Sequence, residues 1–130
     1  MRVVCAAGLA PIADAAMARW FTPDFRRRDA ETVARFRATF ERTRVEGYVG
    51  CCAALRDGDL AASTHGVACP TLVIAGRADE ATTPEQGRWL ASQVQHPQYA
   101  ELDAAHLSNV ERAEQFTDVV CRFLGEDQYG

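Results

Sequence analysis

The sequence has no apolar run close to the roughly 20 residues that span a bilayer, and its five cysteines include no C-x-x-C pair. It also lacks an excess of positive charge, because its formal net charge is −4. These absences argue against a membrane span, against a zinc site or disulfide framework, and against a nucleic-acid partner. We therefore expect a cytoplasmic protein that binds no metal, no membrane and no nucleic acid.

The composition is that of an ordinary globular protein, with 130 residues, 48% hydrophobic and 25% charged. This length suits one compact domain or a large piece of a bigger one. The opening MRVVCAAGLAPIADAAMA has the outline of an export signal. Because Pro11 and Asp14 interrupt its apolar run and alanine is only weakly hydrophobic, we favour a helical segment over a signal peptide.

Residues 1–64 carry apolar side chains at helical spacing, and we expect three or four helices and no strand there. Thr22 and Pro23 predict a turn followed by a helix start, since proline is tolerated at the first helical position. Asp29 is a candidate cap for the long helix that follows. We take residues 1–64 as one helical domain. The apolar positions are Leu9, Ile12, Ala16, Met17, Trp20, Val33, Phe36, Phe40, Val45, Tyr48 and Cys52.

Residues 65–130 change to alternating strands and helices, and we take them as a second, α/β segment. The apolar run 71–75, preceded by proline and followed by glycine, predicts a strand buried on both faces of a parallel sheet. We expect a helix over 84–94, a second strand over 98–102 and an amphipathic helix over 110–124. This order predicts an α/β fold with a parallel sheet. Two strands cannot form such a sheet alone.

Asp79 follows the first predicted strand and His106 follows the second. Because the carboxyl ends of parallel strands meet at one edge of a sheet, the two side chains can come together there. An aspartate that accepts a proton from a histidine ring fixes the tautomer of that ring and supports its action as a general base. The alternative is that Asp79 caps the next helix and His106 is an ordinary loop residue. Spacing alone leaves both interpretations open.

The segments TLVIAGRADEATTP and ELDAAHLSNVE resemble the C-terminal half of an α/β-hydrolase, and of the 3-oxoadipate enol-lactonase family in particular. The matching positions include Gly76, Asp79, Pro84 and His106. The HLSNVE run is the more specific signal. ADAAMARWFTPDF and EGYVGCCAALRDGDL resemble the start and the end of the helical lid of these lactonases. The resemblance thus covers residues 8–124, as a lid followed by the last strand-helix units of the sheet.

The resemblance implies a serine α/β-hydrolase that opens an enol-lactone to 3-oxoadipate in the β-ketoadipate pathway of aromatic degradation, without a metal or cofactor. Asp79 matches the acid of the triad and His106 its general base. Arg19 and Trp20 match a pair that faces the substrate, a small lactone bearing a carboxylate, which a guanidinium binds well. Without the resemblance, we would favour a surface charge for Arg19 and a helix core position for Trp20.

The sequence departs from the family in one respect, because it has no G-x-S-x-G segment to present a nucleophile. Its serines, Ser63, Ser92 and Ser108, are not flanked by glycines in that pattern. Cys51 and Cys52 lie in a predicted helix, and we regard them as small apolar residues rather than nucleophiles. We expect the nucleophile to lie on an N-terminal half outside this sequence.

Two hypotheses follow. The first is a truncated enol-lactonase-like hydrolase whose partner is its N-terminal half. The second is a catalytically silent α/β-hydrolase remnant that acts in self-association, as a homo-oligomer, or in binding another partner. Among the other polar residues, His65 and His96 are expected in the linker and a loop. We expect Glu111 to cap the closing helix rather than to hydrogen-bond near the histidine loop.

Overall fold

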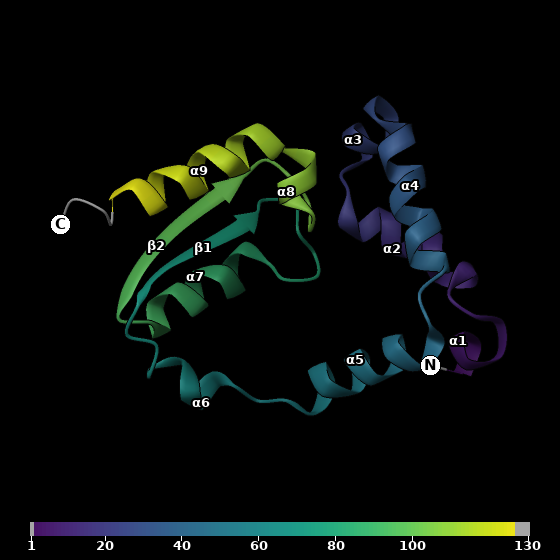
Figure 1. The fold of residues 1–130 in the computed structure, drawn as a ribbon, viewed down its shortest axis with the longest axis horizontal. Helices are drawn as coiled ribbons and strands as arrows, with labels where there is room; N and C mark the ends of the chain where they lie inside the picture. Colours follow the sequence, from purple (N-terminus) through teal and green to yellow (C-terminus); the bar gives the residue numbers. More distant parts are fainter. Residues whose placement is uncertain (1, 127–130) are drawn as a thin grey trace. The chain divides into compact units, whose positions relative to one another are not determined.

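The computed structural model describes residues 2–126, and the side chains within 4–125 (Figure 1). The chain divides into two compact units. One is formed by Met1–Ala18 and Pro23–Asp59, and the other by Arg19–Thr22 and Leu60–Gly130. The short segment Arg19–Thr22 therefore belongs to the unit that contains the sheet, although it lies far from that unit in the sequence.

The first unit is helical, as predicted, but its helices are shorter and more numerous than the predicted three or four. Gly8 has a φ of 71°, a left-handed conformation that suits glycine, and it separates the first helix from the next turn. Thr22 lies between two further helices, and Pro23 begins the second of them, as predicted. The elements are α1 (Arg2–Ala7), the 3-10 turn η1 (Ala10–Ile12), α2 (Ala13–Trp20), α3 (Pro23–Arg28), α4 (Ala30–Glu41) and α5 (Val45–Asp57).

Asp29 caps α4, which confirms the predicted cap. Its side-chain oxygen accepts a hydrogen bond from the amide of Thr32 at 3.0 Å. This bond from the Thr32 amide is the main reason that the pKa of Asp29 is lowered from its ordinary value of 3.8. Further along the unit, the buried ring of Phe40 meets Tyr48 edge-on, with ring centroids 5.8 Å apart. This ring contact connects α4 with the start of α5.

The second unit contains a two-stranded parallel sheet within the described residues. Pro70 pairs with His96 at one end of the sheet and Gly76 pairs with Leu102 at the other. Figure 1 shows α7 on one side of this sheet and α9 on the other. The predicted α/β organisation is confirmed. The elements are α6 (Ala61–Thr64), β1 (Pro70–Gly76), α7 (Pro84–Gln93), β2 (His96–Leu102), α8 (Ser108–Glu111) and α9 (Ala113–Glu126).

Three details of this unit differ from the prediction. Strand β1 is not buried on both faces, because residues 71–74 are only half-buried and burial begins at Ala75. The predicted helix over 110–124 is two helices, since Arg112 leaves the helical conformation with φ −130° and ψ 50°. His96 begins β2 instead of lying in a loop. No helix in the described part of the chain is long and apolar enough to cross a membrane.

Candidate active site

The loops that follow β1 and β2 are hydrogen-bonded to each other beyond the ends of the strands. The amide of Arg77 donates to the carbonyl of Leu102 at 2.8 Å, and the amide of Ala78 donates to Ala104 at 2.9 Å. The two chain segments therefore continue side by side past the sheet. This places Asp79, which follows the first strand, near the turn that carries His106.

Gly76 makes this close approach possible. A Cβ atom at this position would lie 2.1 Å from the carbonyl oxygen of Ala105 and 2.7 Å from that of Ala104. Both atoms belong to the backbone, so no side-chain rotation could relieve the clash. Glycine at the end of β1 is thus required by the packing of the histidine turn against the strand.

The carboxylate of Asp79 is buried, with 5% of the side chain exposed, and it is surrounded by donors. Its Oδ1 accepts from the amides of Ala81 and Thr82 at 2.7 and 3.0 Å. Its Oδ2 accepts from the Thr82 hydroxyl at 2.7 Å and lies 2.8 Å from Nδ1 of His106. The structure thus brings the two predicted catalytic side chains into direct contact.

Burial alone would raise the pKa of Asp79, but hydrogen bonds from His106, Thr82 and Ala81 outweigh it and lower the pKa from the ordinary 3.8. Asp79 is therefore ionised at neutral pH. An ionised carboxylate can only accept, so Nδ1 of His106 carries the hydrogen in the neutral ring. Nε2 is then the basic nitrogen, on a side chain that is 35% exposed. A histidine in this state can act as a general base.

The alternative role for Asp79, as the cap of the next helix, is wrong. Helix α7 is capped by Thr83, whose hydroxyl accepts from the amide of Gln86 at 3.3 Å. The Gln86 side chain accepts in return from the amide of Thr83 at 2.9 Å, which completes a capping box. The Asp79 carboxylate is consequently not used to begin the helix.

The turn that carries His106 is held on both sides. The amide of Leu107 donates to the carbonyl of Trp20 at 3.0 Å. The amide of Ala105 donates to Oε2 of Glu111 at 3.1 Å. Glu111 also accepts from the amide of Thr22 at 3.2 Å and from its hydroxyl. Our prediction that Glu111 caps the closing helix is wrong, since this buried carboxylate binds the histidine turn and the segment after α2.

Arg19 and Trp20, the predicted substrate-binding pair, lie at the C-terminal end of α2. Arg19 is exposed and Trp20 is half-buried. The main chain of Trp20 contacts the residue after His106, so the pair is adjacent to the candidate base. Their contact with a substrate stays a prediction.

The hydroxyls of two of the serines are occupied within their own helices. Ser63 donates to the carbonyl of Leu60 at 2.8 Å, and Ser92 donates to that of Trp89 at 2.6 Å. Ser108 is buried at the start of α8. Cys51 and Cys52 lie within α5, away from the strand-turn-helix setting that presents a nucleophile. Over the described residues, no group of three or more His, Cys, Asp and Glu side chains is arranged to hold a metal.

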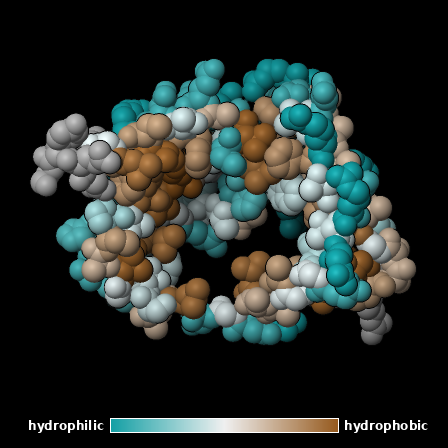
Figure 2. Space-filling view, viewed as in Figure 1, coloured by the Kyte–Doolittle hydropathy of each residue, from teal (hydrophilic) through white to brown (hydrophobic). Residues whose placement is uncertain are grey.

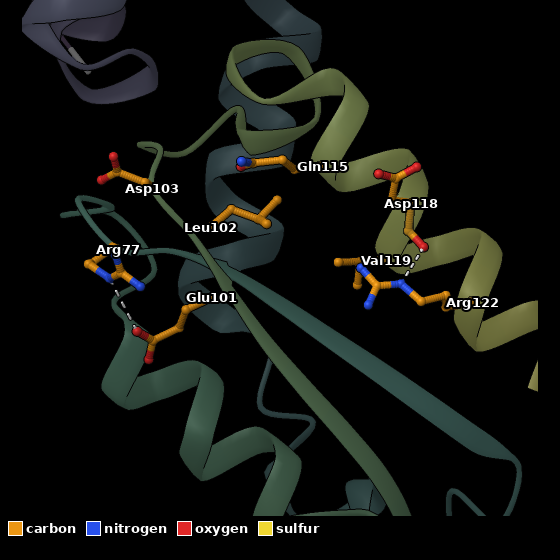
Figure 3. Close-up of a pocket in the computed structure, with 8 residues that line it drawn as sticks. All are labelled: Arg77, Glu101, Leu102, Asp103, Gln115, Asp118, Val119 and Arg122. Atoms are coloured by element: carbon orange, nitrogen blue, oxygen red, sulfur yellow. Dashed lines mark hydrogen bonds and ion pairs between the residues drawn. The ribbon is translucent and has the colours of Figure 1, made fainter.

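A hollow of about 410 Å³ lies between β2 and α9 (Figure 3). Arg77 and Arg122, two of the charged residues that line it, already have partners. Arg77 lies 3.8 Å from Glu101, and Nε of Arg122 donates to the main-chain carbonyl of Asp118 at 3.3 Å. Neither Asp79 nor His106 is among its lining residues. The candidate catalytic pair therefore lies elsewhere.

Sequence and structure comparisons point to one group of enzymes. The chain is 38% identical over 113 residues to 3-oxoadipate enol-lactonase 2 of Acinetobacter baylyi. The match covers 87% of this chain and 42% of that protein. It is 32% identical to 3-oxoadipate enol-lactonase 1 of the same organism, over 90% of this chain and 44% of the relative. The crystal structure of the enol-lactonase from Burkholderia xenovorans matches with a TM-score of 0.93 and 42% identity, over 95% of this chain and 48% of that one.

The chain is similar in sequence and fold to part of the 3-oxoadipate enol-lactonases. The predicted resemblance is thereby confirmed, and the fold is a partial α/β-hydrolase fold. The chain spans less than half the length of the curated relatives that it matches. No protein-family model matches the chain.

Proposed function

We propose that the chain is the part of an enol-lactonase-like serine hydrolase that supplies the acid and the base of the catalytic triad. The observation that carries this proposal is the 2.8 Å contact between buried Asp79 and Nδ1 of the more exposed His106. It leaves Nε2 as the basic nitrogen. The similarity to 3-oxoadipate enol-lactonases supports a lactone as the substrate.

In this proposal, Nε2 of His106 removes the proton from a serine hydroxyl, and the serine oxygen forms a bond to the lactone carbonyl carbon. The ring C–O bond then breaks, and the imidazolium returns its proton to the leaving oxygen. A water molecule, deprotonated by the same nitrogen, hydrolyses the acyl-serine ester and restores the hydroxyl. Asp79 stays ionised throughout and stabilises the imidazolium.

Arg19 and Trp20 are proposed to bind the substrate. Arg19 is exposed and directly precedes Trp20, whose carbonyl accepts a hydrogen bond from the Leu107 amide in the histidine turn. A guanidinium binds a carboxylate through two parallel hydrogen bonds, and an indole can cover an apolar ring. A lactone with a free carboxylate offers both features.

The serine is proposed to come from a completing segment, in the same longer chain or in another one. Within the described residues, β1 pairs with β2 along one edge only. A groove of about 290 Å³ follows β1 and α7, lined by Val73, Ile74, Ala75 and Leu90 among others. Side chains that follow one another in a strand point to opposite faces, so this groove follows the edge of β1. An apolar strand edge of this kind supports docking of a further strand.

Complementation tests this proposal. The segment of the Burkholderia xenovorans enol-lactonase that this chain does not match would be co-expressed with residues 1–130, and lactone opening would be measured. We expect turnover that is abolished by His106→Ala and by replacement of the serine in the added segment. A complex that forms but opens no lactone would contradict the proposed activity.

A second candidate function, binding without catalysis, is favoured by large apolar side chains at the surface. Leu60 is 77% exposed and Trp89 is 50% exposed. Figure 2 also shows apolar surface over the part of the molecule that carries the sheet. The gene sequence upstream of the Met1 codon separates the two candidates. An in-frame G-x-S-x-G segment there supports the hydrolase, whereas its absence from both the gene and any co-purifying chain supports a silent remnant.

We propose a cytoplasmic location on chemical grounds. The five cysteines are all free thiols, and four of them are exposed. Exposed thiols persist in a reducing compartment, whereas oxidising compartments favour disulfides. Alkylation of the five cysteines in intact cells before lysis, read by mass spectrometry, tests this placement.

A further inference from the structure

Glu111 is a buried carboxylate that takes no part in the proton transfers described above. It is 4% exposed. The amides of Thr22 and Ala105 donate to its Oε2 at 3.2 and 3.1 Å, and the Thr22 hydroxyl donates to its Oε1. A buried carboxylate is costly unless donors satisfy it, and here two amides and a hydroxyl do so.

These bonds join two segments that are distant in the sequence, since Thr22 and Glu111 are 89 positions apart. They also lie directly beside the candidate base, His106. The amide before His106, that of Ala105, is held by Glu111, and the amide after it, that of Leu107, is held by Trp20. Two neighbouring groups, the Trp20 carbonyl and the Glu111 carboxylate bound to Thr22, therefore fix the backbone on either side of the candidate base.

Two other contacts near the turn do not replace the bond from the Ala105 amide to Glu111. Gly76 lies close to the carbonyl oxygen of Ala105. The side chain of Arg112 donates to the carbonyl of Asp103 at 2.8 Å, three residues before His106. Neither contact satisfies the amide of Ala105, so loss of the Glu111 carboxylate would leave a buried donor without its acceptor.

We propose that Glu111 is a positioning residue, which holds the turn so that Nδ1 of His106 faces Asp79, and which ties this turn to the Trp20–Thr22 segment. The proposal deepens the proposed function and rests on it. A displacement of about 1 Å in a catalytic group can lower turnover by about a hundredfold. Glu111 would therefore act through the orientation of His106, without touching the substrate.

The test measures the tautomer of His106 by ¹⁵N NMR of the imidazole nitrogens in the full 130-residue chain, at a pH where the ring is neutral. The chain has three histidines, so the His106 signals are assigned by their loss in His106→Gln. Free imidazole favours the Nε2–H form, whereas a ring held against ionised Asp79 carries the hydrogen on Nδ1. Exchange of the Ala105 amide with solvent is measured in the same samples.

We expect wild type to have the Nδ1–H form. Glu111→Met, which removes the acceptors at similar length, should lower the Nδ1–H population and speed Ala105 exchange by about fivefold or more, as expected for one lost hydrogen bond. Glu111→Gln keeps one acceptor oxygen and should retain most of the wild-type behaviour. If Glu111→Met does not fold, Thr22→Val is compared with Thr22→Ser instead. Only valine removes the hydroxyl that donates to Glu111, so the difference between these two variants tests the role of the carboxylate.

Folded Glu111→Met and Thr22→Val variants with wild-type His106 signals and wild-type Ala105 exchange overturn the positioning role and leave the proposed function intact. A wild-type chain with the Nε2–H form overturns both, because His106 is then not held by Asp79. Failure of the complementation assay, with the expected NMR changes, contradicts the proposed activity alone.

Discussion

Replacement of Gly76 by alanine should disrupt the junction between β1 and the histidine turn. The added Cβ would lie 2.1 Å from the Ala105 oxygen, 2.7 Å from the Ala104 oxygen and 2.9 Å from the Ala105 carbonyl carbon. Ordinary carbon–oxygen contacts are about 3.3 Å or longer, so the turn must move by about 1 Å. That movement also strains the 2.9 Å bond from the Ala78 amide to Ala104.

Overpacking of this kind costs about 1–3 kcal/mol, and loss of a backbone hydrogen bond adds about 1 kcal/mol. We therefore expect Gly76→Ala to lower the free energy of unfolding by about 2–4 kcal/mol, a large share of the stability of a small domain. Urea denaturation followed by circular dichroism, at one fixed protein concentration, measures it.

Gly47→Ala is the matched control. A Cβ at Gly47, within α5, meets nothing within 4 Å. Alanine is a better helix former than glycine by about 0.8–1.0 kcal/mol, so this variant should be as stable as wild type or more so. If Gly76→Ala and Gly47→Ala change stability alike, the close approach of β1 to the histidine turn is refuted.

Three further predictions concern the candidate site. In the completed hydrolase, Arg19→Ala should lower kcat/KM for a carboxylate-bearing lactone by roughly ten- to a hundredfold, about 1.5–3 kcal/mol, and leave a neutral ester of similar size nearly unaffected; equal losses on both substrates would indicate a structural role. Because the folded pKa of Asp79 is below its ordinary value of 3.8, the stability that its ionised form contributes is present above that value and is lost as pH falls through the lower folded pKa; wild type and Asp79→Asn should converge in unfolding free energy on acidification, and a constant difference would contradict this. Residues 1–130 alone should open no lactone and should self-associate when their mass is measured in solution; a folded monomer whose turnover is lost in His106→Ala would mean that the nucleophile lies within this sequence.

Local sequence patterns predicted the elements and much of the candidate site. The apolar run before Gly76 indicated β1, and the positions of Asp79 and His106 after successive strands predicted their meeting at one sheet edge. The cap at Asp29 followed from its place before a helix. Each of these inferences depends on a few neighbouring residues and on the geometry of parallel strands.

Two kinds of contact were not predicted. One kind joins segments that are distant in the sequence, and the other is a local bond between a turn and an aspartate side chain. The bond between Thr22 and Glu111 has no local pattern, because the two residues belong to different elements. The bonds to Asp79 from the amides of Ala81 and Thr82 could have been found, since an aspartate side chain in a turn commonly accepts from backbone amides two or three residues further on. The burial of β1 was overestimated because a continuous apolar run predicts a strand inside a larger sheet that is covered on both faces. Among the described residues, β1 has one partner strand.

The central claim is that Asp79 and His106 activate a serine on a segment outside this sequence. The most direct measurement is labelling of the complemented protein with a fluorophosphonate, a reagent for activated serines, with the labelled residue located by peptide mass spectrometry. We expect label on the serine of the added segment, at a rate that falls by at least about a hundredfold in His106→Ala, as expected for loss of a general base. Label on a residue of this chain, or labelling that does not depend on His106, would contradict the account.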